Sequence, residues 1–269
     1  MPNFKTLVTL VAVCLFCETA SQGNFAPRPN GLANLSHKRD NEVANLTFYT
    51  LSFGLPDKAP IYRFESTLII PNGSPPDKNF QGAVKAVWPG LQNKDLLQNV
   101  LTNQKKVASE NKNEQWFHLP FFCCHPAGDF KTEVQLYPGD ALTSIYVWDI
   151  PHNKYLDSWT LVTANAGKDA GAKGFTGGVV YDQKIAGGGE PYNQAILAVE
   201  LQGLGEWDFG SFTWRNIIVM ARTKETKWCT KLNTTNNFKF RTSMPVATTE
   251  GELTTCYIAT VVFKSPTGK

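Results

Sequence analysis

One carboxylate, Glu200, stands inside an otherwise apolar run, QAILAVELQG, at residues 194–203. If this run is a strand, its side chains alternate between two faces, with Leu197, Val199 and Leu201 on one face and Glu200 on the other. A carboxylate on the less apolar face can bind water or a ligand, or it can act as a general acid or base. We expect Glu200 to face a ligand or solvent, and catalysis is the alternative.

Aromatic side chains on other segments could form a binding surface beside this carboxylate. Tyr146 and Trp148 share one face of a predicted strand, while Trp88 and Trp214 lie on two other strands. Aromatic faces with a few hydrogen-bonding groups suit sugar rings or extended peptides. The sequence therefore predicts a shallow ligand groove lined by these four rings. The alternative is that the rings complete the packing between two sheets.

Motifs for other chemistries are missing from the sequence. It contains no G-x-S-x-G, no H-E-x-x-H, no P-loop and no EF-hand loop. Cys123, Cys124 and His125 are adjacent, so they lack the C-x-x-C spacing that lets two thiolates bind one metal ion. We expect no metal ion and no cofactor.

The cysteines indicate disulfides instead. Beyond the N-terminal leader the chain holds Cys123, Cys124, Cys229 and Cys256. In an oxidising compartment such a set most often forms disulfides, and several connectivities are open. Adjacent residues of an extended segment point to opposite faces, so a bridge between Cys123 and Cys124 would be strained. We expect Cys229 to pair with Cys256 or with one of the two adjacent cysteines.

The N-terminus has the layout of a secretory signal peptide, residues 1–21. A basic residue precedes an apolar run at 7–17, and small residues follow it. No stretch approaches the ~20 apolar residues that a membrane helix needs, so we expect no membrane span. Glycosylation sequons at Asn34, Asn45 and Asn233 agree with secretion.

The remainder divides into an arm and one domain. Residues 22–39 are largely polar and end in a dibasic pair, so they form a flexible arm or a propeptide. Residues 40–269 suit a single β domain, because sandwiches of about 200–250 residues can fold around one core. The net charge of +3 is too small to indicate a nucleic-acid partner.

Alternating and β-branched segments dominate the domain. Only Asp95–Leu101 could form a helical turn, and the glycine-rich stretch 170–189 is predicted to be a long loop. Short strands separated by proline and glycine are typical of an all-β sandwich or jelly roll. The predicted strands are 44–52, 61–70, 83–88, 115–123, 131–137, 144–149, 158–164, 195–201, 213–221, 237–241 and 256–263.

Several of these segments resemble a known family. The stretches VWPGLQNKDLLQNVL (87–101), YPGDALTSIYVWD (137–149), QAILAVELQG (194–203) and EWDFGSFTWRNI (206–217) are similar to those of the secreted glutamic peptidases, the eqolisins, and their non-peptidase relatives. This resemblance implies a concanavalin-A-like jelly-roll sandwich of two antiparallel sheets.

In that family, a glutamate and a glutamine on neighbouring strands activate water and stabilise the tetrahedral intermediate. In this chain Thr102 stands where the amide is expected, with Gln98 and Gln104 nearby. Two family glutamates, four residues apart, correspond to Ile196 and Glu200. The resemblance therefore implies a non-peptidase relative.

We thus expect a secreted, non-enzymatic protein that binds an extracellular glycan or matrix protein, or that is structural in such a matrix. The alternative is an acid endopeptidase of the glutamic type that uses Glu200 and a nearby amide, for which Gln98 is the candidate.

Overall fold

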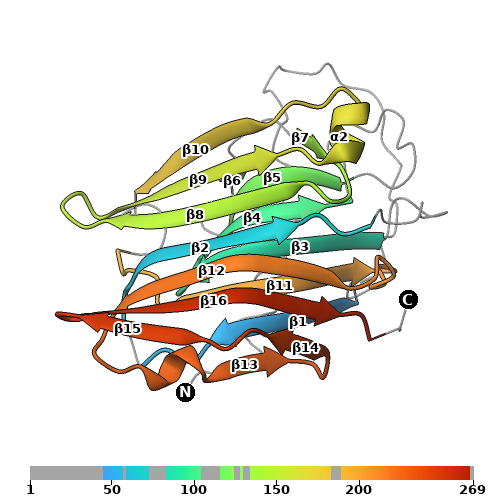
Figure 1. Cartoon of the computed structure of the whole chain (residues 1–269). Coiled ribbons are helices and arrows are strands. Elements are labelled where there is room, and N and C mark those ends of the chain that lie inside the picture. The colour runs from blue at the N-terminus through green and yellow to red at the C-terminus, as the bar shows by residue number, and fades with distance from the viewer. Residues whose placement is uncertain are drawn as a thin grey trace, which may run out of the picture.

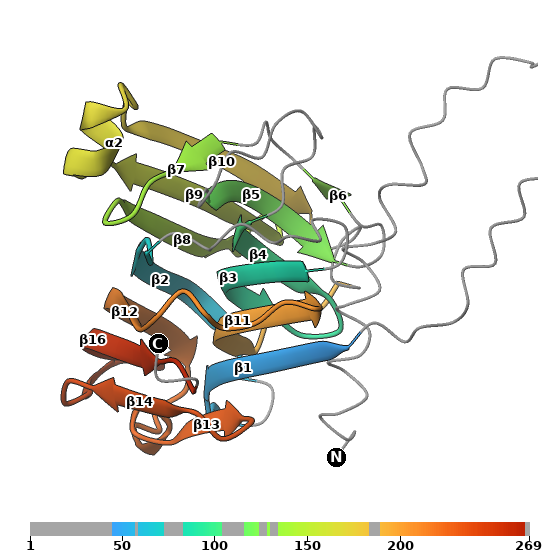
Figure 2. The ribbon, with the colours of Figure 1, turned by 90° about the vertical axis from the view of Figure 1, so that its right-hand side faces the viewer.

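The computed structural model describes residues 45–56, 59–72, 83–103, 116–123, 128–129, 134–182 and 189–266. The described strands form two antiparallel sheets, A and B, which lie face to face as two layers (Figures 1 and 2). The predicted all-β sandwich is therefore confirmed. The jelly-roll arrangement of the strands stays a prediction.

Sheet A follows the order β13-β1-β11-β3-β4-β5-β6, and β7 also pairs with β5. Its strands are β1 (Leu46–Phe53), β3 (Ala83–Gln92), β4 (Leu96–Thr102), β5 (Trp116–Cys123), β6 (Gly128–Asp129), β7 (Val134–Leu136), β11 (Gln194–Gly203) and β13 (Leu232–Thr235).

Sheet B follows the order β10-β9-β8-β2-β12-β16-β14, and β15 also pairs with β16. Its strands are β2 (Ile61–Ile69), β8 (Ala141–Asp149), β9 (Lys154–Val162), β10 (Phe175–Asp182), β12 (Phe212–Arg222), β14 (Lys239–Thr242), β15 (Val246–Glu250) and β16 (Leu253–Lys264).

The main hydrophobic core lies between the two layers. Leu197 and Val199 on β11 are fully buried there, and Leu201 is 6% exposed. Each fully buried side chain of this size contributes about 1.5–3 kcal/mol through the hydrophobic effect. The alternation expected for this segment is confirmed on its apolar face.

Strand β4 corrects the prediction of a helical turn at Asp95–Leu101. All seven residues of Leu96–Thr102 are buried, and the strand pairs with β3 on one side and β5 on the other. A strand that is buried on both faces shows no alternation of apolar and polar residues. Periodicity alone therefore could not distinguish it from a short helix.

Strand β10 corrects the prediction of a long loop at 170–189. Its Gly177 is paired with Trp159 of β9, and a Cβ atom at Gly177 would lie 2.6 Å from the Trp159 Nε1 atom. A glycine inside a strand often marks such a close approach. The short helix α2 (Asn165–Asp169), which the sequence did not predict, precedes this strand.

A disulfide joins Cys229 to Cys256, with 5.3 Å between their Cα atoms. It connects the 3₁₀ turn η2 (Lys227–Cys229) to β16. Of the partners that the sequence left open for Cys229, the structure shows Cys256. Cys123 is also disulfide-bonded, whereas Cys124 lies outside the described residues.

Three predictions lie entirely outside the described residues, namely the signal peptide 1–21, the arm 22–39 and the sequon at Asn34. The two sequon asparagines that are described, Asn45 and Asn233, are both exposed. Within the described ranges, the helices are too short or too polar to cross a membrane.

Candidate functional site

Glu200 lies on the face of sheet A that points away from sheet B. This outer face also carries Trp88 and Ala198, which belong to a second cluster of buried apolar side chains. The Glu200 carboxylate accepts a hydrogen bond from the Trp88 indole Nε1 atom at 2.9 Å and one from the Gln202 amide Nε2 atom at 2.5 Å. Its side chain is 0% exposed, so the expectation of a solvated carboxylate is wrong.

Burial changes the acid chemistry of this carboxyl group. Desolvation raises the pKa of Glu200 to about 7, and the hydrogen bonds from Gln202 and Trp88 oppose part of that shift. A carboxyl group in this state can hold a proton near neutral pH. Two donors fix its orientation, which suits a structural role as well as a chemical one.

The register of sheet A separates Glu200 from Gln98. Gly90 pairs with Gln98 on one side and with Ile196 on the other, so these three residues form one row across the sheet. Glu200 belongs to a different row, with Ala86 and Thr102. The two rows are four residues apart, which is about 13 Å along the strands.

Gln98 therefore has an isoleucine, and not a carboxylate, two strands away in its own row. Its side chain is fully buried, and neither its Nε2 nor its Oε1 atom has a hydrogen-bond partner among the described residues. Gly90, between Gln98 and Ile196, leaves no room for a larger residue, because a Cβ atom there would lie 2.9 Å from the Leu97 carbonyl oxygen.

The structure does not bring the four predicted groove aromatics together. Tyr146 and Trp214 are fully buried in the core between the sheets, and Trp88 lies on the outer face of sheet A. Trp148 is half-buried and stacks on Tyr155 with 6.2 Å between ring centroids. The alternative, packing between the sheets, holds for Tyr146 and Trp214.

The physical reason lies in the two apolar faces of β8. Ile145 and Val147 occupy one face, Tyr146 and Trp148 the other, and alternation does not say which face turns inward. The aromatic face buries more apolar surface, so it occupies the core. The Tyr146 hydroxyl donates a hydrogen bond to the Pro89 carbonyl oxygen at 2.9 Å, which satisfies its polar group across the two sheets.

A buried carboxyl group between the sheets was missed by sequence reasoning. Asp157 on β9 is 1% exposed and accepts a hydrogen bond from the Asn99 side-chain amide at 2.8 Å. Burial raises the pKa of Asp157 to about 8, and the Asn99 hydrogen bond opposes this shift. The sequence KYLDSWT contained a signal for this. Asp157 is two residues from both Tyr155 and Trp159, so all three side chains share the inward face of β9.

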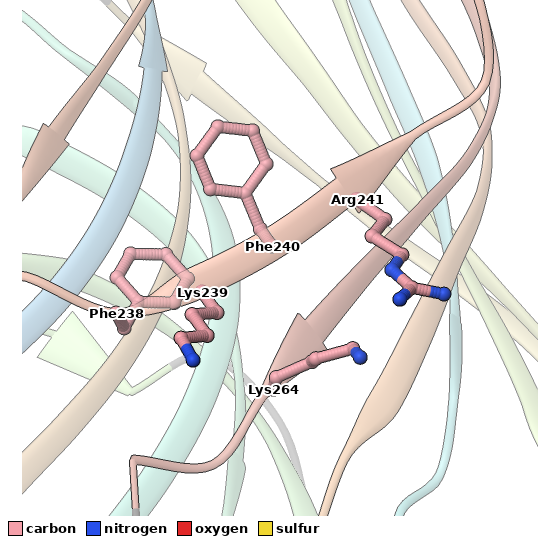
Figure 3. A pocket seen from close by; sticks show the side chains of 5 residues that line it. All are labelled: Phe238, Lys239, Phe240, Arg241 and Lys264. Carbon is pink, nitrogen blue, oxygen red and sulfur yellow. The ribbon is translucent and has the colours of Figure 1, made fainter.

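A hollow of about 450 Å³ lies at the edge of sheet B (Figure 3). Its lining consists of Phe238, Lys239, Phe240 and Arg241, from β14 and the residue before it, and Lys264 from the end of β16. We call it the edge pocket. Strand β14 ends the order of strands in sheet B, so the pocket opens beside an edge strand.

The side chains of the edge pocket have a regular arrangement. Lys239 and Arg241 project from the same face of β14 because they are two residues apart. Phe238 and Phe240 project from the opposite face and are half-buried against the core (Figure 3). The cations and the rings therefore line the pocket from opposite faces of β14.

The edge pocket was not predicted from the sequence, although the sequence contains a signal for it. Residues 226–249 contain four cationic residues, Lys227, Lys231, Lys239 and Arg241, and no acidic residue. The small net charge of the whole chain hides this local segregation. Within the described residues, no group of histidine, cysteine or acidic side chains is arranged to hold a metal ion.

No family model matches the chain, and no curated protein is significantly similar to it. The resemblance to the glutamic peptidases therefore rests on the sequence motifs alone.

Proposed function

We propose that this chain is a secreted, non-enzymatic β-sandwich protein that binds an extracellular glycan or matrix component. The observation that carries the proposal is the edge pocket, which offers the half-buried rings of Phe238 and Phe240 together with three cationic side chains. Aromatic faces pack against the apolar faces of sugars, and a few polar groups fix the orientation of the ligand.

The register of sheet A supports a binding role over a peptidase role. A glutamic peptidase needs an acid and an amide close enough to act on one water molecule. Glu200 and Gln98 stand in different rows of sheet A, and the β11 residue in the row of Gln98 is Ile196. The acid endopeptidase alternative therefore lacks a Glu200–Gln98 pair, and the amide that Glu200 does contact, Gln202, is buried together with it.

The disulfide between Cys229 and Cys256 supports secretion, because such bonds persist in oxidising compartments. The exposure of Asn45 and Asn233 leaves both sequons accessible to a glycosyltransferase. Both observations are compatible with an extracellular protein.

Binding of the full chain to a glycan array and to extracellular matrix extracts tests the proposal. We expect binding by the unmodified protein and about fivefold weaker binding by Phe240→Ala, because one ring contact is lost. Val180→Ala, on the opposite edge strand of sheet B, serves as the control because Val180 is also apolar and is 55% exposed. A folded protein that binds no glycan and no matrix component would refute the proposal.

The peptidase alternative has its own test. Digestion of a denatured protein substrate between about pH 2 and 5 covers the range in which an acid endopeptidase works. We expect no cleavage. Cleavage that Glu200→Gln abolishes would favour the alternative over the binding function.

A further inference from the structure

We propose that the edge pocket recognises the anionic groups, sulfate or carboxylate, of an acidic glycan chain. This inference rests on the glycan-binding function proposed above and adds the chemical class of the ligand. Three cations line this pocket without partners among the described residues, and two phenylalanine rings line it from the other face of β14.

The three cations lie within the reach of one short anionic segment. Lys239 and Arg241 are two residues apart on β14, about 6.6 Å along the strand. Lys264 is the direct partner of Lys239 across the β14–β16 ladder, and directly paired residues have their Cβ atoms about 5 Å apart. All three side chains therefore extend from one face of the sheet (Figure 3).

These cations are free to bind an external anion. Among the described residues, none of Lys239, Arg241 and Lys264 takes part in an ion pair or a side-chain hydrogen bond. Strands β12, β14 and β16 lie side by side, and their sequences contain lysine and arginine but no aspartate or glutamate. These three strands therefore contribute positive and no negative charge around the pocket, which attracts an anion. The nearby acidic residues Glu206 and Asp208 flank Trp207, whose carbonyl oxygen accepts a hydrogen bond from Ser265, the residue after Lys264.

Protection of the sheet edge is the competing explanation for these charges. Lysines on an edge strand discourage pairing with another chain. That explanation suits Lys239 and Arg241 on β14, but Lys264 lies on β16, which is flanked by β12 and β14. The half-buried Phe238 and Phe240 do not bear on this choice, because they pack against the core from the other face of β14, with 4.8 Å between the ring centroids of Phe238 and Phe263.

An acidic glycan fits this combination better than an acidic peptide does. Each sugar unit presents an apolar C–H face for a ring and, when sulfated or oxidised, an anionic group for a cation. The Arg241 guanidinium can bind two oxygens of one sulfate or carboxylate, and the lysines act as point charges. Phe238 and Phe240 line the pocket from the opposite face of β14, so a sugar unit would meet them only around the edge of that strand.

The experiment measures the affinity of the full chain for immobilised heparin, hyaluronan, neutral dextran and poly-glutamate. The test variant is Lys239→Gln/Arg241→Gln/Lys264→Gln. We expect it to bind heparin about tenfold more weakly than the unmodified protein, because the contacts of three cations with the anionic groups of heparin are lost. We also expect binding of the unmodified protein to weaken as salt is added, because salt screens exposed charges.

The control variant, Lys94→Gln/Lys168→Gln/Lys173→Gln, removes the same charge from exposed positions on the β3–β4 turn and around α2. We expect it to bind heparin as the unmodified protein does. Thermal unfolding of both variants checks that each is folded, and the salt dependence of the unmodified protein tests the inference without any variant.

Each outcome decides one point. Preference for heparin over hyaluronan identifies sulfate as the recognised group, and equal binding identifies the carboxylate. Equal binding of dextran and heparin, or full affinity in the triple variant, overturns the inference while glycan binding stands. Tighter binding of poly-glutamate than of heparin overturns it in favour of an acidic protein. A folded protein that binds no glycan overturns both this inference and the proposed function.

Discussion

The buried Asp157 should make the protein less stable as the pH rises from acid to neutral, and Asp157→Asn should remove this dependence. The folded-state pKa of Asp157 is about 8, against an ordinary value of 3.8, because burial disfavours the charged form. Below pH 3.8 the group is protonated in both the folded and the unfolded chain, and its contribution to stability is fully present. That contribution is lost as the pH rises to about 8.

The size of the effect follows from the pKa difference. Each unit of difference corresponds to about 1.4 kcal/mol, so a shift of about four units amounts to on the order of 5 kcal/mol. Asparagine has nearly the same shape as aspartate and keeps an oxygen for the Asn99 amide. We therefore expect Asp157→Asn to be within about 1 kcal/mol of the unmodified protein at pH 4 and several kcal/mol more stable at pH 8.

Urea unfolding at half-unit steps between pH 4 and 8.5 measures this difference. Comparison of the two proteins removes the contributions of other buried groups. Those groups include Glu200, whose raised pKa acts in the same direction, and His118, whose pKa of about 3 makes it destabilising in acid. Asp169→Asn is the control, because Asp169 is exposed on α2.

A constant difference between Asp157→Asn and the unmodified protein across the whole pH range would refute the reasoning. It would mean that Asp157 titrates alike in the folded and unfolded chains, so that burial does not act on its charge. A pH-dependent difference of equal size in the Asp169→Asn control would refute it as well.

Replacing both Cys229 and Cys256 by alanine should lower the free energy of unfolding by about 3.5 kcal/mol, because the disulfide spans a sequence separation of 27 residues; an unchanged urea midpoint would contradict this. Gly90→Ala should cost about 1–3 kcal/mol, since its Cβ atom would lie 2.9 Å from the Leu97 carbonyl oxygen. Calorimetry should show a lower melting temperature, and an unchanged one would show that the strands can separate locally. Glu200→Gln keeps an acceptor for the Trp88 indole but cannot ionise, so the loss of stability between about pH 4.5 and 7 should become smaller. The same urea series checks this, and an unchanged slope would contradict the raised pKa.

Much of the fold could be predicted because strands carry a local signal. The segments around β1, β2, β8, β11, β12 and β16 alternate or are rich in β-branched residues, and all of them are strands. The prediction also omitted the short strands β13 and β15, although β15 is rich in β-branched residues. Two other errors fell where this signal is missing. β4 is buried on both faces and shows no alternation, and β10 contains Gly177, whose small size is needed by Trp159 on the neighbouring strand. Neither requirement can be read from the segment itself.

The candidate site was predicted less well, because it depends on which faces turn inward. The sequence identified Glu200 as the unusual carboxylate of its strand, but burial and the hydrogen bonds from Trp88 and Gln202 come from the folded sheet. Tyr146 and Trp214 had the right chemistry for a groove and lie in the core instead. The edge pocket needed β14 and β16 to be adjacent before Lys264 could join Lys239 and Arg241, and nothing local brings them together.

The sequence by itself determined which side chains share a face of a strand, because that depends only on a repeat of two residues along the chain. This repeat alone puts Leu197 and Leu201 on one face of β11 and Glu200 on the other, whichever strands pair with β11. Only the tertiary structure decided the register between strands, which put Gln98 in a row with Ile196 rather than with Glu200. Register is set by pairing and packing between residues far apart in the chain, and these contacts have no counterpart in the local pattern of either strand.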